Sequence, residues 1–350
     1  MQLLFGHLSC ERPIHFTATD DAAVARLESL ELGVVFAADP QNCARLRAFD
    51  AKAKRGRAFD DDARDATSWG PTTGGDAVYI SSGSGVVDLT IAQMVIGTSE
   101  PTSNASSCMQ DVACSAAGET QEVEQASRAI ALIRFVRGDS SYVCTGGLVN
   151  DAAGTRTPYL LTAQHCISTD EEAASVELVW DHRSASCGTG PAGPARRTYG
   201  ARLLVSSTET DVALLRLDHL PPNGVFLGVE LAPLAEGTPT WRLSHADGAP
   251  QRFSAGTVRT TGAGCSTAPR PHFVYTAPTA GAVSKGSSGA PLLLPGLRIA
   301  GQLLGLCGPT PDDPCATYND AVDGSIAASW PLLAPFLDPP AVARRRAVMH

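Results

Sequence analysis

The chain has 350 residues, of which 33 are glycine, 24 are proline and only 18% are charged. This length allows a two-lobed enzyme with an additional segment, and the Gly and Pro content predicts short strands and turns rather than long charged helices. Neither nucleic-acid binding nor membrane insertion is expected, because the net charge is −9 and no apolar run approaches the roughly 20 residues that span a bilayer.

The 10 cysteines are distributed singly, without the closely spaced pairs that usually hold zinc. An even number of isolated cysteines favours a disulfide framework and an oxidising compartment, so we expect a secreted, extracellular protein. No signal peptide is readable at the given N-terminus, because residues 1–10 lack a basic region followed by an apolar one.

Residues 1–100 differ in pattern from the rest of the chain. Their periodicity predicts helices over 20–32 and 41–54, and β-branched alternation predicts strands at 76–80 and 86–91. A run of small polar residues at 97–107 is typical of a linker. We therefore expect a small mixed α/β N-terminal segment over 1–100 and a domain boundary after it.

From residue 129 onward, short apolar runs alternate with turns. Strands as short and numerous as these predict an all-β barrel or sandwich, and residues 330–337 predict a short closing helix. The predicted strands lie at 130–136, 142–149, 159–162, 176–180, 202–205, 212–217, 239–243, 252–258, 272–275, 290–294 and 297–304.

The strongest local signal is the sequence Gly-Ser-Ser-Gly-Ala-Pro at 286–291. Acyl transfer needs a nucleophilic hydroxyl beside backbone N–H groups that converge on an oxyanion, and flanking glycines allow the tight bend that turns these groups inward. Ser288 is the candidate nucleophile, and the N–H groups of Gly286 and Ser288 are the candidate oxyanion hole. Taken alone, an ordinary Gly/Ser loop explains the same residues equally well.

A second signal is the apolar strand that leads into His165 and Cys166. A general base must be held rigidly, and a strand end fixed by a disulfide holds a histidine in this way. Cys144, near the end of the preceding strand, is the natural partner of Cys166. The alternative is a surface histidine beside a structural bridge.

The third signal is Asp211, directly before the apolar run 212–217. Such an acid can accept a hydrogen bond from the imidazole and fix its tautomer. An Asp before a strand is common, so its weight comes from the order His165, Asp211, Ser288. That order is the order of the chymotrypsin type, and it differs from those of subtilisin and the α/β-hydrolases.

With these residues in place, the chain resembles the bacterial lysyl-endopeptidase and trypsin-like branch of the chymotrypsin-fold serine proteases. The resemblance runs from about residue 108 to residue 337 and includes the segments 144–150, 158–166, 210–215, 286–291 and 301–303. It implies two six-stranded antiparallel barrels over 101–338 with the active site between them, and a C-terminal tail over 339–350. The implied activity is that of a serine endopeptidase acting on proteins or peptides as a monomer and without a cofactor.

The same resemblance implies how the cysteines pair. It gives Cys144–Cys166, Cys114–Cys187 and a bridge from Cys108 to a late cysteine, for which we expect Cys315. Cys265 and Cys307 would then pair together, although an exchange of Cys307 with Cys315 stays open. Cys10 and Cys43 are not assigned.

The residues expected to set substrate preference depart from the resemblance. Animal trypsins hold a basic substrate side chain with an Asp at the position of Ala282 here. The lysyl-endopeptidase branch supplies an acid from a later loop, and Asp320 lies closest to that place, so we predict cleavage after Lys or Arg with Asp320 in the S1 pocket. Leu304 replaces a histidine of the lysine-specific relatives, which argues against strict Lys preference. The competing acids are Asp312, Asp313 and Asp323.

Residues 1–100 are interpreted as the C-terminal part of a pro-region, which makes the chain a zymogen. Ser287 stands where mammalian trypsins have the acid that pairs with a new N-terminus, so activation by that salt bridge is not expected. No Lys or Arg occurs between residues 65 and 127. If a trypsin-like enzyme releases itself, it therefore cuts at or before Arg64; otherwise another protease removes the segment, or the segment stays.

Alternative functions stay open. The chain could be a catalytically inactive homologue that serves as a binding module, or a serine protease with a small apolar or acidic preference instead of a basic one. A metal site formed by the His and Cys residues is less well supported, because only His165 and Cys166 combine candidate ligands at short spacing.

Overall fold

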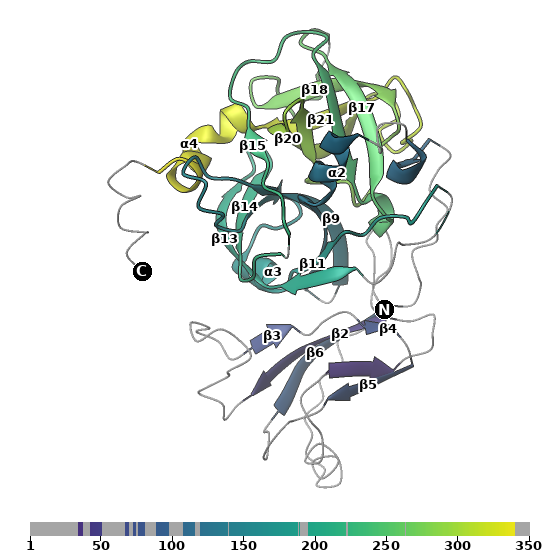
Figure 1. The fold of residues 1–350 in the computed structure, drawn as a ribbon, viewed down its shortest axis with the longest axis vertical. Helices are drawn as coiled ribbons and strands as arrows, with labels where there is room; N and C mark the ends of the chain where they lie inside the picture. Colours follow the sequence, from purple (N-terminus) through teal and green to yellow (C-terminus); the bar gives the residue numbers. More distant parts are fainter. Residues whose placement is uncertain are drawn as a thin grey trace. The chain divides into compact units, whose positions relative to one another are not determined.

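A computed structural model provides the structure of the protein (Figure 1). It describes residues 108–115, 120–138, 140–187, 189, 195–221, 223–262 and 264–339, and before these only a set of strands. Two compact units are distinguished: residues 1–102 with Phe135–Tyr142, and residues 103–134 with 143–350.

The first unit contains antiparallel strand pairs. Strand β1 pairs with β5, and β2 pairs with β3, β4 and β6. The bounds are β1 (Val34–Ala37), β2 (Cys43–Asp50), β3 (Thr67–Trp69), β4 (Thr73–Gly74), β5 (Asp76–Ile80) and β6 (Leu89–Gly97).

The helix predicted over 41–54 is wrong, because residues 43–50 form β2. Arg45 and Arg47 alternate with Leu46 and Ala48, and this alternation has the period of two residues that is typical of a strand. Strand β6 pairs with β2 from Cys43 to Asp50. The strand predicted at 76–80 is confirmed as β5, and that at 86–91 overlaps β6. The helix predicted over 20–32 and residues 98–107 of the predicted linker lie outside the described residues.

The second unit is built from two antiparallel sheets. The first has the strand order β12-β11-β8-β9-β10-β14-β13, and in the described part of the chain no pairing joins its two edges. Its strands are β8 (Ile130–Arg137), β9 (Ser140–Val149), β10 (Tyr159–Ala163), β11 (Glu177–Trp180), β12 (Arg196–Tyr199), β13 (Ala201–Ser207) and β14 (Val212–Leu217).

The second sheet closes into a barrel. Its order is β20-β19-β16-β17-β18-β21, and β21 pairs back onto β20. The strands are β16 (Pro239–Ser244), β17 (Arg252–Val258), β18 (Phe273–Ala280), β19 (Pro291–Leu294), β20 (Arg298–Cys307) and β21 (Asp320–Ser325), with short β7 (Gln110–Asp111) and β15 (Gly228–Val229) at its margins.

Short helices complete this unit. They are α2 (Gln121–Ser127), α3 (Asp170–Ala174) and α4 (Ile326–Leu337), with 3-10 turns at Val112–Cys114 and Ala246–Gly248. The predicted closing helix is confirmed as α4, which begins four residues earlier than expected, at Ile326 rather than at Trp330.

The all-β prediction is confirmed: the second unit combines one closed barrel with one open, half-barrel sheet. Every strand predicted from residue 129 onward is present. The patterns missed β12 and β21. Arg196 and Arg197 of β12 are exposed, and β21 buries Asp320 and Asp323, so neither strand has an apolar alternation.

One apolar core joins the two sheets. Leu161 and Leu214 of the first sheet belong to the same buried cluster as Leu243 and Leu293 of the second, together with Leu333 of α4. Fully burying such a side chain stabilises the fold by roughly 1.5–3 kcal/mol. This shared core fixes the strands near whose ends the candidate catalytic residues lie: His165 after β10, Asp211 before β14 and Ser288 before β19.

A glycine on β9 allows the two sheets to approach closely. A Cβ added to Gly147 would lie only 2.5 Å from Pro291 Cγ at the start of β19. Any larger residue would push β9 away from the chain that follows Ser288. The Gly-Gly pair in the motif around Cys144 therefore has a packing role.

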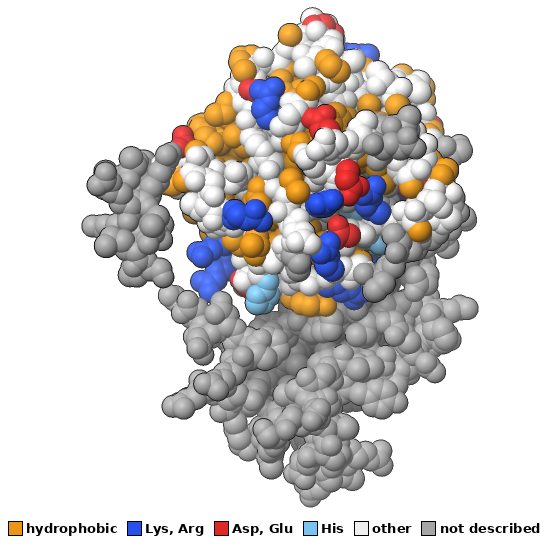
Figure 2. All heavy atoms as spheres, viewed as in Figure 1, with side chains coloured by type: hydrophobic (Ala, Val, Ile, Leu, Met, Phe, Trp, Pro, Cys, Tyr) orange, Lys and Arg blue, Asp and Glu red, His pale blue; other side chains and the backbone are white. Residues whose placement is uncertain are grey.

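The surface carries charges of both signs. On the face shown in Figure 2, basic and acidic side chains of the described residues are interspersed among apolar and neutral groups rather than gathered by sign. Within the described residues no helix combines the length and the apolar character needed to cross a membrane.

Candidate active site

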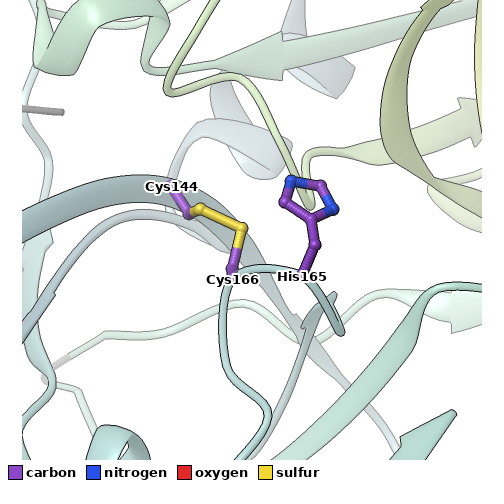
Figure 3. Close-up of side chains that lie close together, drawn as sticks. All are labelled: Cys144, His165 and Cys166. Carbon is purple, nitrogen blue, oxygen red and sulfur yellow. A yellow bond between two sulfur atoms is a disulfide. The ribbon is translucent and has the colours of Figure 1, made fainter. Parts of the chain in front are cut away.

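His165 lies in the turn that follows β10. The chain turns at Ala163, whose carbonyl accepts the N–H groups of Cys166 and Ile167. Cys166 is bridged to Cys144 of β9, and Figure 3 shows this bridge beside the imidazole. Because the two sulfur atoms are bonded to each other, the cluster offers no thiolate to a metal.

Asp211 holds both the backbone and the ring of His165. One carboxylate oxygen accepts the His165 N–H at 2.9 Å, and the other lies 2.8 Å from the imidazole Nδ1. The Asp211 side chain is 6% exposed and that of His165 is 40% exposed. The Nδ1 side of the imidazole therefore faces the buried acid, which can fix the tautomer of the ring.

The backbone around Asp211 is fixed as firmly as its side chain. Its carbonyl accepts the N–H of Gln164 at 2.7 Å. The buried amide of Gln302, on β20, donates to the carbonyls of Thr210 and Asp211 at 2.9 and 3.1 Å. Asp211 itself has a positive φ of 52°, a strained backbone that these contacts maintain. A residue of the closed barrel thus positions the acid that precedes β14 of the first sheet.

Ser288 is brought to the end of β10 by its neighbours. Its carbonyl accepts the N–H of Thr145 at 2.8 Å. Gly289, with φ of 79°, packs so closely that an added Cβ would lie 2.7 Å from the N of Ala163. The nucleophile candidate thus sits against the strand that leads to His165.

The loop before Ser288 has the form of an oxyanion hole. Gly286 has φ of 86°, and the Thr145 hydroxyl donates to its carbonyl at 2.8 Å. Within the described residues, the N–H groups of Gly286 and Ser288 donate to no acceptor, whereas the N–H of Ser287 donates to the carbonyl of Ser284. Two donors are therefore left for a developing negative charge.

The sequence analysis did not identify two supporting residues, Thr145 and Gln302, although both lie inside the quoted motifs. Thr145 holds Gly286 and also accepts the N–H of His245 at 3.0 Å, while Gln302 holds Asp211. Both side chains are fully buried in strands whose neighbours are apolar. A polar residue within an otherwise buried strand is the signal that would have identified them.

Two stacked histidines lie behind the Gly286 loop. The rings of His182 and His245 are 5.7 Å apart, and the His245 carbonyl would lie 2.7 Å from a Cβ on Gly286. Burial, together with nearby positive charge, lowers the pKa of His245 to about 3 and that of His182 to about 4. Both imidazoles are therefore neutral near pH 7.

A cavity of about 80 Å³ lies beside the loop that carries Ser288. Its walls come from β16, from Ala282 and Val283 before the nucleophile, and from Ala321 of β21. At its edge Arg242 donates to both carboxylate oxygens of Asp323, at 2.6 and 2.9 Å, and both side chains are buried. Burial raises the pKa of Asp323, and Arg242 acts in the opposite direction.

Asp320 is not among the residues that line this cavity. Its carboxylate pairs with Arg259 at 3.2 Å. Burial raises its pKa, while Arg259 and Arg270 act to lower it. Successive residues of a strand point to opposite sides, so Asp320 faces away from the side of β21 that carries Ala321.

The four bridges expected in the protease unit are present. They are Cys144–Cys166, Cys114–Cys187, Cys108–Cys315 and Cys265–Cys307. The alternative in which Cys307 and Cys315 exchange partners is thereby excluded. Cys10 lies outside the described residues, and of Cys43 only the backbone is described.

The fold and the site define a protein of the serine protease class. Residues 102–317 match the family described as lysyl endopeptidase, C-terminal domain, and the chain belongs to this family.

A lysyl endopeptidase of Pseudomonas aeruginosa is 30% identical over 164 residues, which cover 45% of this chain and 35% of that protein. The chain thus spans about a third of the length of this relative. Among solved structures, the HtrA-type protease AlgW with tripeptide has a TM-score of 0.44 at 18% identity and covers 61% of this chain and 62% of its own. A serine endoprotease from Yersinia pestis has a TM-score of 0.44 at 18% identity and covers 60% and 63%.

Proposed function

We propose that this chain is a serine endopeptidase that hydrolyses peptide bonds through an acyl-enzyme on Ser288. The observation that carries the proposal is the contact of Asp211 with both the N–H and the Nδ1 of His165, while Gly289 places Ser288 against the same turn. This arrangement matches the roles of nucleophile, base and orienting acid.

Each step of the reaction uses a group whose position supports it. His165 Nε2 takes the proton of Ser288 as the hydroxyl oxygen attacks the peptide carbonyl carbon. The N–H groups of Gly286 and Ser288 donate to the oxyanion. The imidazolium, stabilised by the Asp211 carboxylate, then protonates the leaving amine, and a water molecule repeats the sequence on the acyl-enzyme. These residues need no cofactor for this chemistry.

Labelling of the full chain with a fluorophosphonate tests the proposal. The reagent should attach to Ser288, because among the described serines it is the one that follows His165 and Asp211 in the site and lies beside N–H groups without a described acceptor. Ser288→Ala should abolish labelling, and Ser266→Ala, an exposed serine on another loop, should retain it. An unlabelled wild-type chain that still binds peptides would favour the inactive binding module instead.

Cleavage after Lys or Arg is a finer prediction with narrower support. It depends on the resemblance and on Asp320 as the acid of the S1 pocket. The ion pair of Asp320 with Arg259, and its absence from the lining of the cavity beside Ser288, do not favour that role. A protease that cleaves after Lys or Arg should lose this preference in Asp320→Asn.

We also propose that the protein is secreted and made as a zymogen, with residues 1–100 as a pro-region. The four disulfides support an oxidising compartment. Ser287 supports activation without a new N-terminal salt bridge, because its hydroxyl lies 3.0 Å from that of Ser244. N-terminal sequencing and the intact mass of secreted protein test this; an intact chain retained inside the cell contradicts it.

A further inference from the structure

The turn over residues 246–249 lies directly behind the candidate oxyanion hole. The Asp247 N–H donates to the carbonyl of Lys285 at 2.6 Å, and an added Cβ on Gly286 would lie 2.7 Å from the carbonyl oxygen of His245. The Lys285 carbonyl belongs to the same peptide group as the Gly286 N–H. In the trans form, which this peptide has, the two groups point in opposite directions. The hydrogen bond from Asp247 therefore fixes the direction of the Gly286 N–H.

The turn itself has an unfavourable backbone conformation. Asp247 and Gly248 have φ values of 52° and 72°, in the left-handed region that a residue other than glycine adopts at a cost. Two backbone hydrogen bonds close the turn, from the N–H of Gly248 to the His245 carbonyl at 2.9 Å and from the N–H of Ala249 to the Ala246 carbonyl at 3.0 Å. Such a conformation persists where its surroundings hold it in place.

Two imidazole rings hold the carbonyls at the end of the turn. The Nδ1 of His245 lies 2.9 Å from the carbonyl oxygen of Ala249, and the Nε2 of His182 lies 3.2 Å from that of Gly248. Both rings are neutral near pH 7, because burial and nearby positive charge lower their pKa values. A neutral imidazole has one N–H and a carbonyl oxygen can only accept, so these two nitrogens are the donors.

The same two rings connect the turn to both sheets. His182 follows β11 of the first sheet, and its carbonyl accepts the N–H of Gln251 at 2.9 Å. His245 follows β16 of the closed barrel, and its N–H donates to the Thr145 hydroxyl of β9 at 3.0 Å. The rings stack with their centroids 5.7 Å apart. A movement of the turn relative to either sheet would break these contacts.

Packing alone does not explain a histidine at position 245. Its Nε2 is buried and has no hydrogen-bond partner among the described residues. A buried acceptor without a partner is unfavourable, and an apolar ring of similar size would avoid this cost. An apolar ring would, however, lack the donor at Nδ1. The hydrogen bond to the Ala249 carbonyl is therefore the contribution that is specific to the imidazole.

We propose that His182 and His245 are positioning residues of the oxyanion hole, which keep the 246–249 turn in the form that directs the Gly286 N–H toward the substrate oxygen. Both rings act through the turn and its hydrogen bond to Lys285, not on the reacting atoms. Without them the peptide between Lys285 and Gly286 can rotate, and one of the two donors to the developing negative charge is lost. This inference rests on the proposed protease function.

The rate at which a fluorophosphonate labels the full chain tests the inference. The phosphoryl oxygen of the reagent gains negative charge as Ser288 attacks, so labelling depends on the oxyanion donors and requires no knowledge of the preferred substrate side chain. His245→Phe keeps a stacked ring but removes the donor at Nδ1. We expect this variant to lower the second-order rate constant of labelling by about 100-fold, since removing an oxyanion donor costs about 10²–10³-fold.

Variants that retain the donor are the matched controls. His245→Asn keeps a donor near the Ala249 carbonyl and His182→Gln keeps one near the Gly248 carbonyl, so both should label within about fivefold of the wild-type rate. His182→Phe should be slow, like His245→Phe. Rates are compared per folded molecule at neutral pH, with urea unfolding as the measure of the folded fraction. A role in stability alone would slow no folded molecule. Wild-type rates in both Phe variants, or Asn and Gln variants as slow as the Phe variants, would overturn the inference.

A double-mutant cycle with Thr145→Val checks that the effect reaches Gly286. The Thr145 hydroxyl donates to the Gly286 carbonyl and accepts the His245 N–H. If both residues act on the same peptide, Thr145→Val combined with His245→Phe should lose clearly less than the product of the two single losses. A loss equal to the product contradicts the inference. Should His245→Phe fail to fold, His182→Phe takes its place in the cycle.

The wild-type chain separates this inference from the proposed function. A wild-type chain that the reagent does not label overturns the protease function and the inference with it. A chain that is labelled at Ser288, with Phe variants that react equally fast, overturns the positioning role alone.

Discussion

Two buried carboxylates in this protein have opposite tasks. Asp211 pairs with an imidazole that is 40% exposed and can gain and lose a proton, whereas Asp323 pairs with a guanidinium that is 4% exposed and always charged. In the first pair, the imidazole of His165 is exposed enough for a substrate to reach it. The second pair is closed to water on both sides.

The difference shows how partner and exposure decide what a buried acid does. An acid with a titratable, accessible partner can stabilise a charge that appears during a reaction. An acid with a permanent, buried partner cancels a charge that is always present in the folded protein. The following predictions alter one pair at a time.

The largest effect is expected from Asp211→Asn. An amide can fill the same space but favours the wrong imidazole tautomer, so kcat should fall by about 10⁴-fold while the fold is retained. Turnover of a peptide substrate measures the loss, and circular dichroism checks the fold. Asp323→Asn should keep far more activity per folded molecule, and a comparable loss there would remove the contrast between the two acids.

The next largest effect is expected on stability, from Arg242→Met. Removing one partner leaves the Asp323 carboxylate buried and unpaired, which should lower the free energy of unfolding by about 3–5 kcal/mol. The double variant Arg242→Met with Asp323→Leu should recover most of this loss, because both charges are then gone. Denaturant unfolding of the three proteins measures it. A double variant as unstable as the single one would contradict the account.

The candidate catalytic residues could be proposed from the sequence because each lies in a local pattern. His165 ends an apolar strand beside a cysteine, and Ser288 lies between glycines whose positive φ values the loop requires. Asp211 was supported only by chain order, but its two contacts with His165 are present. Local geometry and residue type coincide at these positions.

The surroundings of the cavity could not be predicted in the same way. Asp320 and Ala321 are neighbours in sequence, and which of them faces the cavity depends on the register of β21, since a shift by one residue exchanges the two faces. The Arg242–Asp323 pair joins residues 81 positions apart, so no local sequence pattern predicts it. The wrong helix prediction over 41–54 has a similar origin. Pairing with β6, which is distant in sequence, gives residues 43–50 the extended conformation of β2.

The last prediction concerns His182 and His245, a third arrangement, in which two buried groups lie together uncharged. Their pKa values of about 4 and 3 lie below the ordinary 6.5, so the unfolded chain binds more protons than the folded one below pH 6.5. Their contribution to stability is complete above pH 6.5. It falls by up to about 1.4 kcal/mol per pH unit for each residue as the pH drops toward 4.

Replacing both rings separates this effect from the general acid sensitivity of the carboxylates. His245→Asn retains a donor near the Ala249 carbonyl, which the ring Nδ1 contacts at 2.9 Å, and His182→Gln retains one near the Gly248 carbonyl. The double variant should unfold with a shallower dependence of its unfolding free energy on pH between 6.5 and 4, measured with urea. A slope equal to that of the wild type would mean that the stacked pair has no part in the response to pH, and that the loop around Gly286 depends on other contacts.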